Sequence, residues 1–296
     1  MKKVLIIGKH SYIGTSFASY AKTYAPELEV MSVSASDGTW RNTDFSGYDA
    51  VLHVAGKAHA DVGNVTEDVK KEYYDVNYKM AVEAADMAKS AGVKLFIYPS
   101  SMIIYGESAP IGKHKVITKD TMPTPANFYG DSKLQADLVI QKMSDETFQT
   151  AVLRLPMVYG KNSKGNYPVL AKMAKKLPVF PKVKNERSMI YIGNLCEFLR
   201  EIIENGSGGV FYPQNAEYTV TSEMVKKIAE AADKQIHLTA VLTPFVYLAG
   251  KIPGKIGQLA NKAFGSCIYD KELSRYENNR YQIYSLQESV QRTEGA

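Results

Sequence analysis

The feature that most constrains the fold is an alternation of strand-like and helix-like segments along the first half of the chain. Short apolar runs of strand length stand at 3–8, 28–33, 50–54, 94–99 and 150–155. Segments whose apolar residues repeat with helical spacing lie between them, at 13–24, 68–90 and 129–143. Strands that alternate with helices form βαβ units and a parallel sheet. The pattern therefore predicts an α/β fold with a doubly wound parallel sheet.

After residue 160 the alternation gives way to helices and loops. A polar loop, GKNSKGNYPVL, begins there, an amphipathic helix is expected at 193–205, and 209–213 has the composition of one more strand. We therefore expect two domains, each built from separate segments. The first, which contains the sheet, comprises 1–155 plus 190–213, and the second, a smaller and mostly helical lobe, comprises 156–189 plus 214–296.

Composition and charge argue against several classes of function. The 296 residues are 45% hydrophobic and 23% charged, as in ordinary soluble globular proteins, and the net charge is +5. The lysines are spread along amphipathic segments, whereas a nucleic-acid-binding surface usually concentrates its basic residues in one patch. We therefore expect no nucleic acid partner, and the small basic surplus suits an anionic small-molecule substrate. Cys196 and Cys267, the only cysteines, lie far apart and indicate reduced thiols in a cytoplasmic protein rather than a disulfide or a zinc site.

The apolar runs are too short for membrane insertion. None reaches the roughly 20 residues of a membrane-spanning helix, and the run at the N-terminus is too short for an export signal. The nearest candidate, LTAVLTPFVYLAG at 238–250, contains Pro244 and is expected to be a surface helix of the second lobe. Peripheral membrane contact through this segment, helped by Lys251, Lys255 and Lys262, is the alternative.

A glycine turn directly after the first strand predicts a phosphate-binding site. Gly8 and Gly14 are its outer glycines, and Ser11 stands where a Rossmann-type turn usually has a third glycine. The amides of the following helix N-terminus, together with the Ser11 hydroxyl, would bind the pyrophosphate of a dinucleotide. An ordinary capped turn between a strand and a helix is the alternative. The predicted cofactor contacts in this turn are Gly8, His10, Ser11, Tyr12, Ile13 and Gly14.

The residues after the second strand modestly favour NADP(H) over NAD(H) as the cofactor. An acidic residue at this position usually binds the ribose hydroxyls of NAD, whereas basic residues suit the additional phosphate of NADP. Here Ser34–Ser36 follow the strand, and the nearest carboxylate, that of Asp37, comes a few residues later than usual. The candidate contacts to the additional phosphate are Lys9, His10 and Arg41. Each of these is otherwise a solvated surface charge.

A tyrosine and a lysine on one helix face form the strongest catalytic signal. Tyr129 and Lys133, in the sequence NFYGDSK, stand four residues apart. A tyrosine with its ordinary pKa of about 10 is a poor acid–base catalyst at neutral pH, and a nearby ammonium group lowers that pKa. The pair therefore predicts a tyrosine that exchanges a proton with a sugar oxygen during hydride transfer. Ser100 and Ser101 end an earlier strand, placed to hydrogen-bond the same oxygen, and an exposed helix pair without function is the alternative.

Together these motifs resemble those of extended short-chain dehydrogenases/reductases of the NAD-dependent epimerase/dehydratase family. The resemblance covers nearly the whole chain, and it implies a Rossmann-type fold in which the first domain binds NAD(P) and the second binds a nucleotide sugar. It is carried by IIGKHSYIG, DAVLHVAGKAH, VNYKMAVEAADMAKSAGVKLFIYPSSMIIYG, NFYGDSK, LRLPMVYG and NERSMIYIGNL.

The resemblance also implies roles for individual residues. Ser101, Tyr129 and Lys133 match the catalytic serine, the acid–base tyrosine and the lysine that also holds the nicotinamide ribose. Ala55 and Gly56 match backbone that passes the ribose and phosphate of the cofactor. The remaining matches are Pro156, Met157 and Val158 beside the nicotinamide, Arg187 at the diphosphate of the substrate, and Asn166 at the nucleotide or sugar.

Three further polar residues carry weaker functional signals. Asn77 resembles a family position that supports the active-site strand, and an exposed helix asparagine is the alternative. His53 and His59 flank the segment VAGKA, where a histidine is usually a structural group rather than a catalyst.

More narrowly, the chain is similar to bacterial capsule and O-antigen enzymes that reduce a UDP-linked 4-keto-6-deoxy-N-acetyl sugar. This implies a homodimeric 4-keto-sugar reductase, acting at carbon 4 of a UDP-linked hexose derivative in surface-polysaccharide precursor synthesis. A 4-epimerase with retained NAD uses the same residues and is the first alternative. A cofactor-sensing protein without catalysis is the second. A dehydratase is less favoured, because it needs an acid–base pair where Met102 and Ile103 stand.

Overall fold

The computed structural model describes residues 1–58 and 65–295 and forms two compact units. Unit 1 comprises 1–106, 122–155 and 195–213, and unit 2 comprises 107–121, 156–194 and 214–296. Relative to the division expected from the sequence, the segments 107–121 and 190–194 belong with unit 2. His59 lies outside the described residues.

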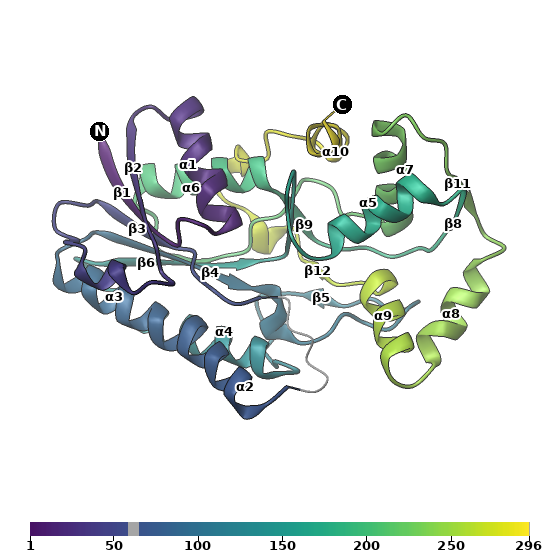
Figure 1. Ribbon diagram of the computed structural model, residues 1–296, viewed down its shortest axis with the longest axis horizontal. Coiled ribbons are helices and arrows are strands. Elements are labelled where there is room, and N and C mark those ends of the chain that lie inside the picture. Colours follow the sequence, from purple (N-terminus) through teal and green to yellow (C-terminus); the bar gives the residue numbers. More distant parts are fainter. Residues whose placement is uncertain (59–64, 296) are drawn as a thin grey trace. The chain divides into compact units, whose positions relative to one another are not determined.

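Unit 1 is built on a six-stranded sheet with the order β10-β6-β4-β3-β1-β2, in which every pair is parallel (Figure 1). From β1 the chain adds β2 on one side of the sheet and then β3, β4, β6 and β10 on the other side. The topological switch point therefore lies between β1 and β3. This confirms the predicted Rossmann-type α/β fold. In chain order the strands are β1 (Lys2–Ile7), β2 (Leu28–Val33), β3 (Ala50–His53), β4 (Leu95–Ser101), β6 (Gln149–Leu155) and β10 (Gly209–Phe211).

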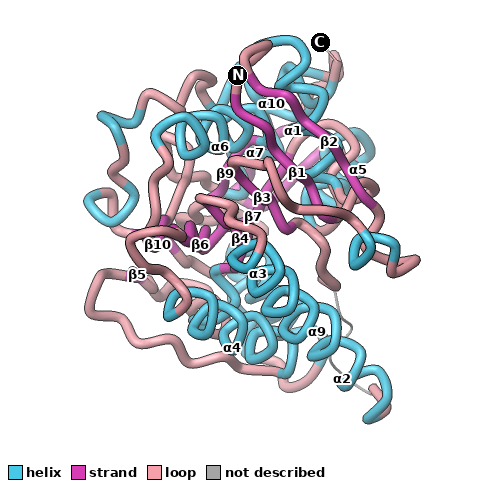
Figure 2. The backbone as a smooth tube through the Cα atoms, turned by 90° about the vertical axis from the view of Figure 1, so that its left-hand side faces the viewer, coloured by secondary structure: helices cyan, strands magenta, loops and turns pink. Residues whose placement is uncertain are grey.

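Helices cover both faces of this sheet. Figures 1 and 2 show α1 and α6 on one face and α2, α3 and α4 on the other. A π-helical turn, Asp75–Lys79, joins α2 to α3, so the helix expected at 68–90 is continuous. The bounds are α1 (Tyr12–Tyr24), α2 (Glu67–Tyr74), α3 (Met80–Ser90), α4 (Phe128–Lys142) and α6 (Ile192–Asn205).

The covered faces explain the composition of the strands. Val4, Leu5, Ile6 and Ile7 are all fully buried in β1, as expected for a parallel strand covered by helices on both sides. The link between β2 and β3 has room only for a 3₁₀ turn, Thr39–Asn42, whose Trp40 is fully buried in the core. Another 3₁₀ turn, Met102–Tyr105, follows β4.

Unit 2 combines helices with three short parallel strand pairs. Its core is formed by aromatic and aliphatic side chains that include Tyr159, Tyr167, Phe180 and Met224. The strand pairs are β5 (Val116–Ile117) with β12 (Ile268–Tyr269), β7 (Met157–Tyr159) with β9 (Met189–Tyr191), and β8 (Val179–Pro181) with β11 (His237–Thr239). The helices are α5 (Asn166–Lys176), α7 (Thr221–Ala231), α8 (Thr243–Lys251), α9 (Lys255–Phe264) and α10 (Leu286–Glu294), with 3₁₀ turns at Glu272–Ser274 and Glu277–Asn279.

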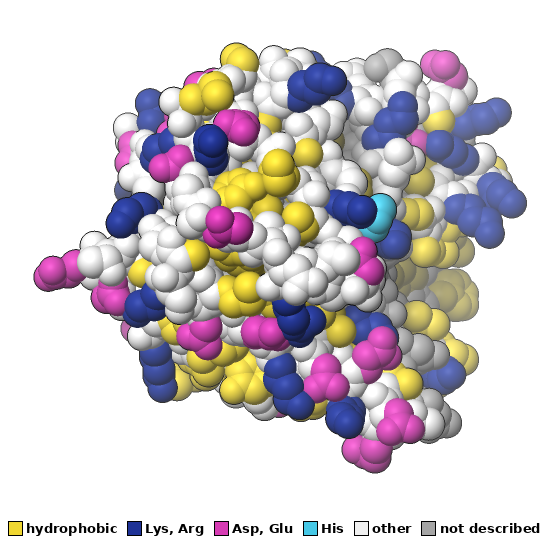
Figure 3. Space-filling view, turned by 60° about the vertical axis from the view of Figure 1, so that its left-hand side comes forward, with side chains coloured by type: hydrophobic (Ala, Val, Ile, Leu, Met, Phe, Trp, Pro, Cys, Tyr) yellow, Lys and Arg dark blue, Asp and Glu magenta, His cyan; other side chains and the backbone are white. Residues whose placement is uncertain are grey.

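The surface and the cysteines agree with an ordinary globular chain. On the face shown in Figure 3, basic and acidic side chains are interspersed. Cys196 and Cys267 are free and buried. Within the part of the chain that the structure describes, no helix has the length and apolar composition to cross a bilayer.

Candidate functional site

The turn between β1 and α1 packs tightly against the end of β3 because two of its residues are glycines. Gly8 has a φ of +119°, and a Cβ atom there would lie 2.9 Å from the backbone nitrogen of Ala55. A Cβ atom at Gly14 would lie 2.9 Å from Val54 Cγ2. Both contacts are shorter than side chains tolerate, so the turn requires glycine at both positions. The turn stands at the carboxyl end of the sheet beside the switch point, where open α/β sheets bind their ligands.

Ser11 fits in place of the usual third glycine because it caps the helix. Its φ is −72°, and its Oγ accepts a hydrogen bond from the Gly14 backbone nitrogen at 2.9 Å. This leaves the hydroxyl proton of Ser11 for a phosphate oxygen. The first turn of α1 contains no acidic residue, so no carboxylate opposes an anion at this helix end. His10 is exposed, and Tyr12 and Ile13 are partly exposed in the same turn.

The end of β2 presents hydroxyl groups rather than a free carboxylate. The Oγ atoms of Ser34 and Ser36 lie 3.3 Å apart. The carboxylate of Asp37 accepts hydrogen bonds from the backbone and hydroxyl of Thr39, at 3.0 and 2.7 Å, and these bonds lower the pKa of Asp37. Lys9 is exposed in the neighbouring turn.

Arg41 was expected to contact a phosphate, but its guanidinium has another partner. It donates to both carboxylate oxygens of Glu83, at 2.5 and 2.6 Å, and lies 4.5 Å from the Trp40 ring centroid. This bidentate pair, which joins residues 42 positions apart, has no local sequence signal. The pair is exposed on both sides, and Arg41 stays a predicted phosphate contact.

Ser101 and Tyr129 are neighbours at the carboxyl end of β4. Ser101 ends the strand, and its Oγ accepts a hydrogen bond from Ile103 N at 3.3 Å. Asn127 caps α4 by accepting from Gly130 N at 3.0 Å, which fixes Tyr129 in the first turn of the helix. A hydrogen bond with Ser101 lowers the pKa of Tyr129, but burial has the larger effect and raises it. The net shift of the Tyr129 pKa is therefore upward, opposite to the shift expected from a neighbouring ammonium group.

Lys133 lies one helical turn further along α4 and is buried. Its Nζ donates to the Pro99 backbone oxygen at 2.9 Å and stands 4.7 Å from the Tyr98 ring centroid. Burial lowers the pKa of Lys133 to about 8, and the carboxylate of Asp137 opposes this shift. The ammonium is thus held beside β4, on the backbone directly before the two serines.

Gly56 and Asn77 close the site from the side of β3. A Cβ atom at Gly56 would lie 3.5 Å from Lys133 Nζ and 3.2 Å from Asn77 Oδ1. Asn77 is fully buried; its Oδ1 accepts from Lys57 N at 2.8 Å, and its Nδ2 donates to Lys57 O and Ser132 Oγ. The side chain therefore joins the π-helical turn to the β3 loop and to α4. The structure thus contradicts the alternative of an exposed helix asparagine.

His53 is a buried neutral group at the end of β3. It is 1% exposed, and neither ring nitrogen has a hydrogen-bond partner among the described residues. Burial, and secondarily the charge of Lys133, lowers the pKa of His53 to about 3. Its ring stacks on Phe96 and Tyr98, as expected for a structural histidine.

The other predicted residues belong to unit 2. Pro156 precedes β7, which contains Met157 and Val158, and Asn166 is the first residue of α5. Arg187 Nη1 donates to the backbone oxygens of Lys262 and Gly265, at 2.9 and 3.1 Å. Burial lowers the pKa of Arg187. A guanidinium has five N–H donors, so these two bonds from one nitrogen are compatible with phosphate binding by the others.

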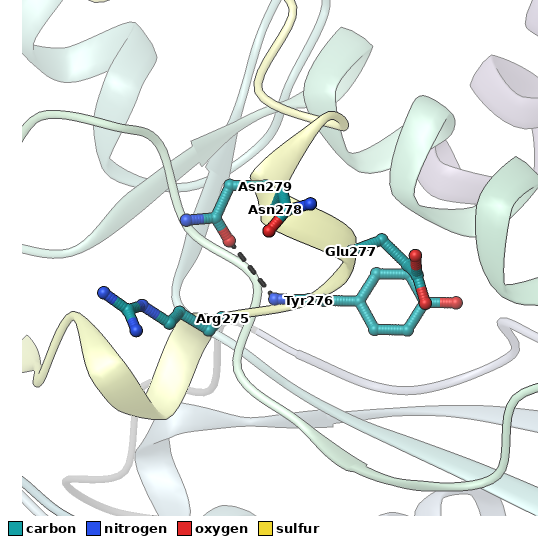
Figure 4. A pocket seen from close by; sticks show the side chains of 5 residues that line it. All are labelled: Arg275, Tyr276, Glu277, Asn278 and Asn279. Carbon is teal, nitrogen blue, oxygen red and sulfur yellow. Dashed lines mark hydrogen bonds between the residues drawn. The ribbon is translucent and has the colours of Figure 1, made fainter.

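Two surface hollows of unit 2 contain none of the predicted residues. The larger, of about 630 Å³, is lined by Arg275–Asn279, where Glu277, Asn278 and Asn279 have left-handed φ values (Figure 4). The smaller, of about 230 Å³, lies between the loop Gly160–Ser163, the start of α5 and the end of α10. The larger hollow has no counterpart in the sequence prediction.

Comparison with known proteins identifies the family. Residues 4–212 match the model of the NAD dependent epimerase/dehydratase family, which is more than half of the chain. The chain belongs to this family.

Curated relatives of this family member include two 4-epimerases. UDP-glucose 4-epimerase of Vibrio cholerae is 29% identical over 280 residues, which cover 86% of this chain and 83% of the relative. N-acetyl-alpha-D-glucosaminyl-diphospho-ditrans,octacis-undecaprenol 4-epimerase of Escherichia coli O157:H7 is 23% identical over 98% of this chain and 93% of its own length. Sequence similarity thus extends through both units.

Solved structures with this fold include epimerases and reductases. UDP-N-acetylglucosamine 4-epimerase from Bacillus cereus superposes with a TM-score of 0.75 at 16% identity, covering 100% of this chain and 99% of its own. A dTDP-4-dehydrorhamnose reductase from Clostridium acetobutylicum gives 0.71 at 15% identity, with 98% of both chains covered. At such low identity these similarities establish the fold of this family member and nothing finer.

Family membership settles the class of protein. The chain is an enzyme of the NAD(P)-dependent epimerase or reductase type. Its cofactor class is a nicotinamide dinucleotide, in agreement with the glycine turn at the switch point.

Proposed function

We propose that this enzyme reduces a UDP-linked 4-keto hexose derivative at carbon 4, with NADPH as the reductant, in the synthesis of surface-polysaccharide precursors. The observation that carries the proposal is the cluster of Ser101, Tyr129 and Lys133 at the carboxyl end of β4, beside the glycine turn. Hydride transfer to a ketone requires a proton donor at the carbonyl oxygen, and the phenol of Tyr129 supplies one.

The residues around the switch point fit a bound dinucleotide. Gly8 and Gly14 let the turn pack closely on the end of β3, and the first turn of α1 that follows contains no acidic residue to oppose an anion. Gly8, Ser11 and Gly14 would hold the pyrophosphate, and Lys133 would hold the nicotinamide ribose. When bound, the reduced nicotinamide supplies a hydride to the keto carbon.

The chain's own residues manage the proton. Tyr129 donates its phenolic proton to the oxygen on carbon 4, and Ser101 hydrogen-bonds that oxygen and orients it. Lys133 stabilises the phenolate that the proton transfer leaves behind.

NADPH is preferred over NADH in this proposal because of the end of β2. The hydroxyls of Ser34 and Ser36 stand where NAD-binding folds usually place a carboxylate, and the carboxylate of Asp37 is bound to Thr39. Lys9, exposed in the neighbouring turn, provides a positive charge for the additional phosphate.

Arg187 is proposed to bind the diphosphate of the substrate. Two classes of molecule can carry the sugar on such a diphosphate. A nucleoside diphosphate such as UDP is the first. The E. coli relative acts on a sugar carried by diphospho-undecaprenol and is similar over 98% of this chain, so a polyprenyl diphosphate is the second.

A 4-epimerase is the second candidate function, and the names of both curated relatives favour it. An epimerase would use the same three residues, but Tyr129 would first act as a base and remove the proton from the 4-hydroxyl. Such an enzyme also retains its NAD in the oxidised form. The two functions therefore differ in the oxidation state of the bound cofactor and in the direction of the first proton transfer at Tyr129.

One assay distinguishes the two functions. The purified protein is incubated with NADPH and UDP-4-keto sugars, and separately with UDP-sugars alone, and the nicotinamide absorbance and the sugar products are followed. Stoichiometric loss of NADPH with a 4-hydroxy product supports the reductase. Formation of a 4-epimer without net cofactor turnover supports the epimerase, and no reaction with either set contradicts both.

A further inference from the structure

An apolar stripe is exposed along the helix pair α8–α9 of unit 2. Phe245 and Leu248 in α8, and Ile256 and Leu259 in α9, stand three residues apart and so share a helix face, and Val241 and Ile252 lie just outside the ends of α8. α8 buries no residue, and α9 buries only Gly257. The stripe, with the exposed fraction of each side chain, consists of Val241 (75%), Phe245 (65%), Leu248 (60%), Ile252 (46%), Ile256 (58%) and Leu259 (66%).

The stripe lies on the side of the helix pair that unit 2 does not use for packing. Tyr247 packs against Gly112, and Asn261 donates to Gly250 O at 2.9 Å while accepting from Ile111 N at 3.0 Å. Thr221 Oγ1 donates to Ala263 O at 2.9 Å. The two helices (Figure 1) are therefore fixed to unit 2 by contacts that leave the stripe exposed.

The segment that carries the stripe has formal charges of one sign only. Residues 234–269 contain four lysines and no aspartate or glutamate. Of these lysines, Lys251, Lys255 and Lys262 lie in α8 and α9 and are exposed. The face shown in Figure 3 instead has both signs interspersed. An apolar stripe on a segment whose charged side chains are lysines is complementary to a surface with an apolar interior and negative headgroups.

We propose that the α8–α9 stripe docks on an anionic phospholipid bilayer. Phe245, Leu248 and Leu259 enter the boundary between headgroups and acyl chains, and the lysines contact lipid phosphates. The contact is peripheral and reversible. It does not depend on the proposed reaction, because it concerns a surface and not the catalytic residues.

Co-sedimentation with vesicles tests the proposal. The full chain is mixed with vesicles of phosphatidylcholine containing phosphatidylglycerol, and with vesicles of phosphatidylcholine alone. We expect binding to the anionic vesicles that weakens with salt and is at least about tenfold weaker on neutral vesicles. No binding to anionic vesicles at low salt, or equal binding to both, overturns the proposal.

Two variants separate the apolar and the electrostatic contributions. The triple variant Phe245→Ser, Leu248→Ser, Leu259→Ser and the triple variant Lys251→Gln, Lys255→Gln, Lys262→Gln are each expected to reduce the partition coefficient at least about tenfold. The matched control is Met31→Ser, Met122→Ser, Val169→Ser, which changes side chains that are 52%, 77% and 53% exposed elsewhere. The control is expected to bind as the parent does, and an equal loss in all three variants contradicts the proposal.

A fluorescence measurement tests directly whether the stripe lies at the bilayer. The one tryptophan, Trp40, is fully buried in unit 1, so Phe245→Trp adds a second, exposed reporter. We expect its emission to shift to shorter wavelength on addition of anionic vesicles. If the reporter does not shift and the stripe variant instead converts a dimer to a monomer in solution, the stripe is an interface between copies and the proposal is wrong.

Discussion

At the scale of single residues, the two groups central to catalysis are both shifted toward their neutral forms. Burial raises the pKa of Tyr129 and lowers that of Lys133 to about 8. Spacing along a helix predicts that the two side chains share one face, but it says nothing about desolvation, which depends on the strands and loops packed against them. The directions of both pKa shifts therefore come from burial, which the sequence does not report.

Removal of the Tyr129 hydroxyl tests this assignment. We expect Tyr129→Phe to lower the rate of NADPH-dependent reduction by about 10²–10⁴-fold, with NADPH affinity, measured by its fluorescence, unchanged. Tyr73→Phe is the matched control, because the Tyr73 ring packs edge-on against Tyr129 at 5.9 Å between centroids. A comparable loss in the control would falsify the assignment.

The lowered pKa of Lys133 predicts the pH dependence of the reaction. Lys133 loses its proton as the pH rises through about 8, so the cation that stabilises the tyrosinate disappears above that pH. We expect kcat/KM for reduction to fall as pH rises through this region, because this parameter reports groups of the free enzyme. Lys133→Arg retains its charge, so its residual activity should show no such step. Identical profiles for both proteins contradict the prediction.

At the scale of secondary-structure elements, α4 is held to the sheet by one buried ion pair. Asp137 is fully buried, and its carboxylate accepts from Arg154 Nε and Nη2 of β6 at 3.0 and 2.9 Å. Arg154 Nη1 also donates to the hydroxyls of Tyr105 and Tyr212. The helix that carries the predicted catalytic pair is therefore fixed against β6, the strand next to β4.

Replacing one partner of this ion pair is expected to lower the free energy of unfolding more than replacing both partners. Asp137→Leu leaves a buried guanidinium without its anion and should lower the free energy of unfolding by about 3–5 kcal/mol. The double variant Asp137→Leu, Arg154→Met should be more stable than Asp137→Leu. Urea unfolding of the single and double variants measures the coupling, and strictly additive effects would show that the two groups act separately.

The glycine turn offers a second comparison at this scale. In Gly8→Ala the alanine must adopt a positive φ, and its Cβ atom would lie 2.9 Å from the Ala55 backbone nitrogen. In Gly92→Ala the alanine must also adopt a positive φ, of 79°, but its Cβ atom has no neighbour within 4 Å. Gly92→Ala should lower the free energy of unfolding by about 1 kcal/mol. Gly8→Ala should lower it further and also weaken NADPH binding. If the two variants lose equal stability and Gly8→Ala binds NADPH as the parent does, the phosphate site lies elsewhere.

At the scale of the whole molecule, the sequence predicts what local patterns determine and misses what distant partners determine. The inner strands of the sheet are found because each is an apolar run buried on both faces, as Val4–Ile7 illustrate. The glycine turn and the tyrosine–lysine pair are likewise local. The pairing of Arg41 with Glu83 and the burial of Asn77 beneath the β3 loop depend on contacts between elements. The same holds for the segment 107–121, which joins unit 2 because β5 pairs with β12 about 150 residues later.

Cofactor preference can be measured on the whole molecule, because a ligand that binds only the folded state stabilises all of it. At a concentration 100 times its dissociation constant, a ligand adds about 2.7 kcal/mol to the free energy of unfolding. We expect NADPH to raise Tm more than NADH at equal concentration, because Ser34 and Ser36 place no carboxylate against the additional phosphate and Lys9 attracts it. Ser36→Asp places a carboxylate on this exposed position and should reduce the shift with NADPH while retaining that with NADH. If the parent protein responds more strongly to NADH and the variant does not alter the order, the preference is for NAD, as a 4-epimerase requires.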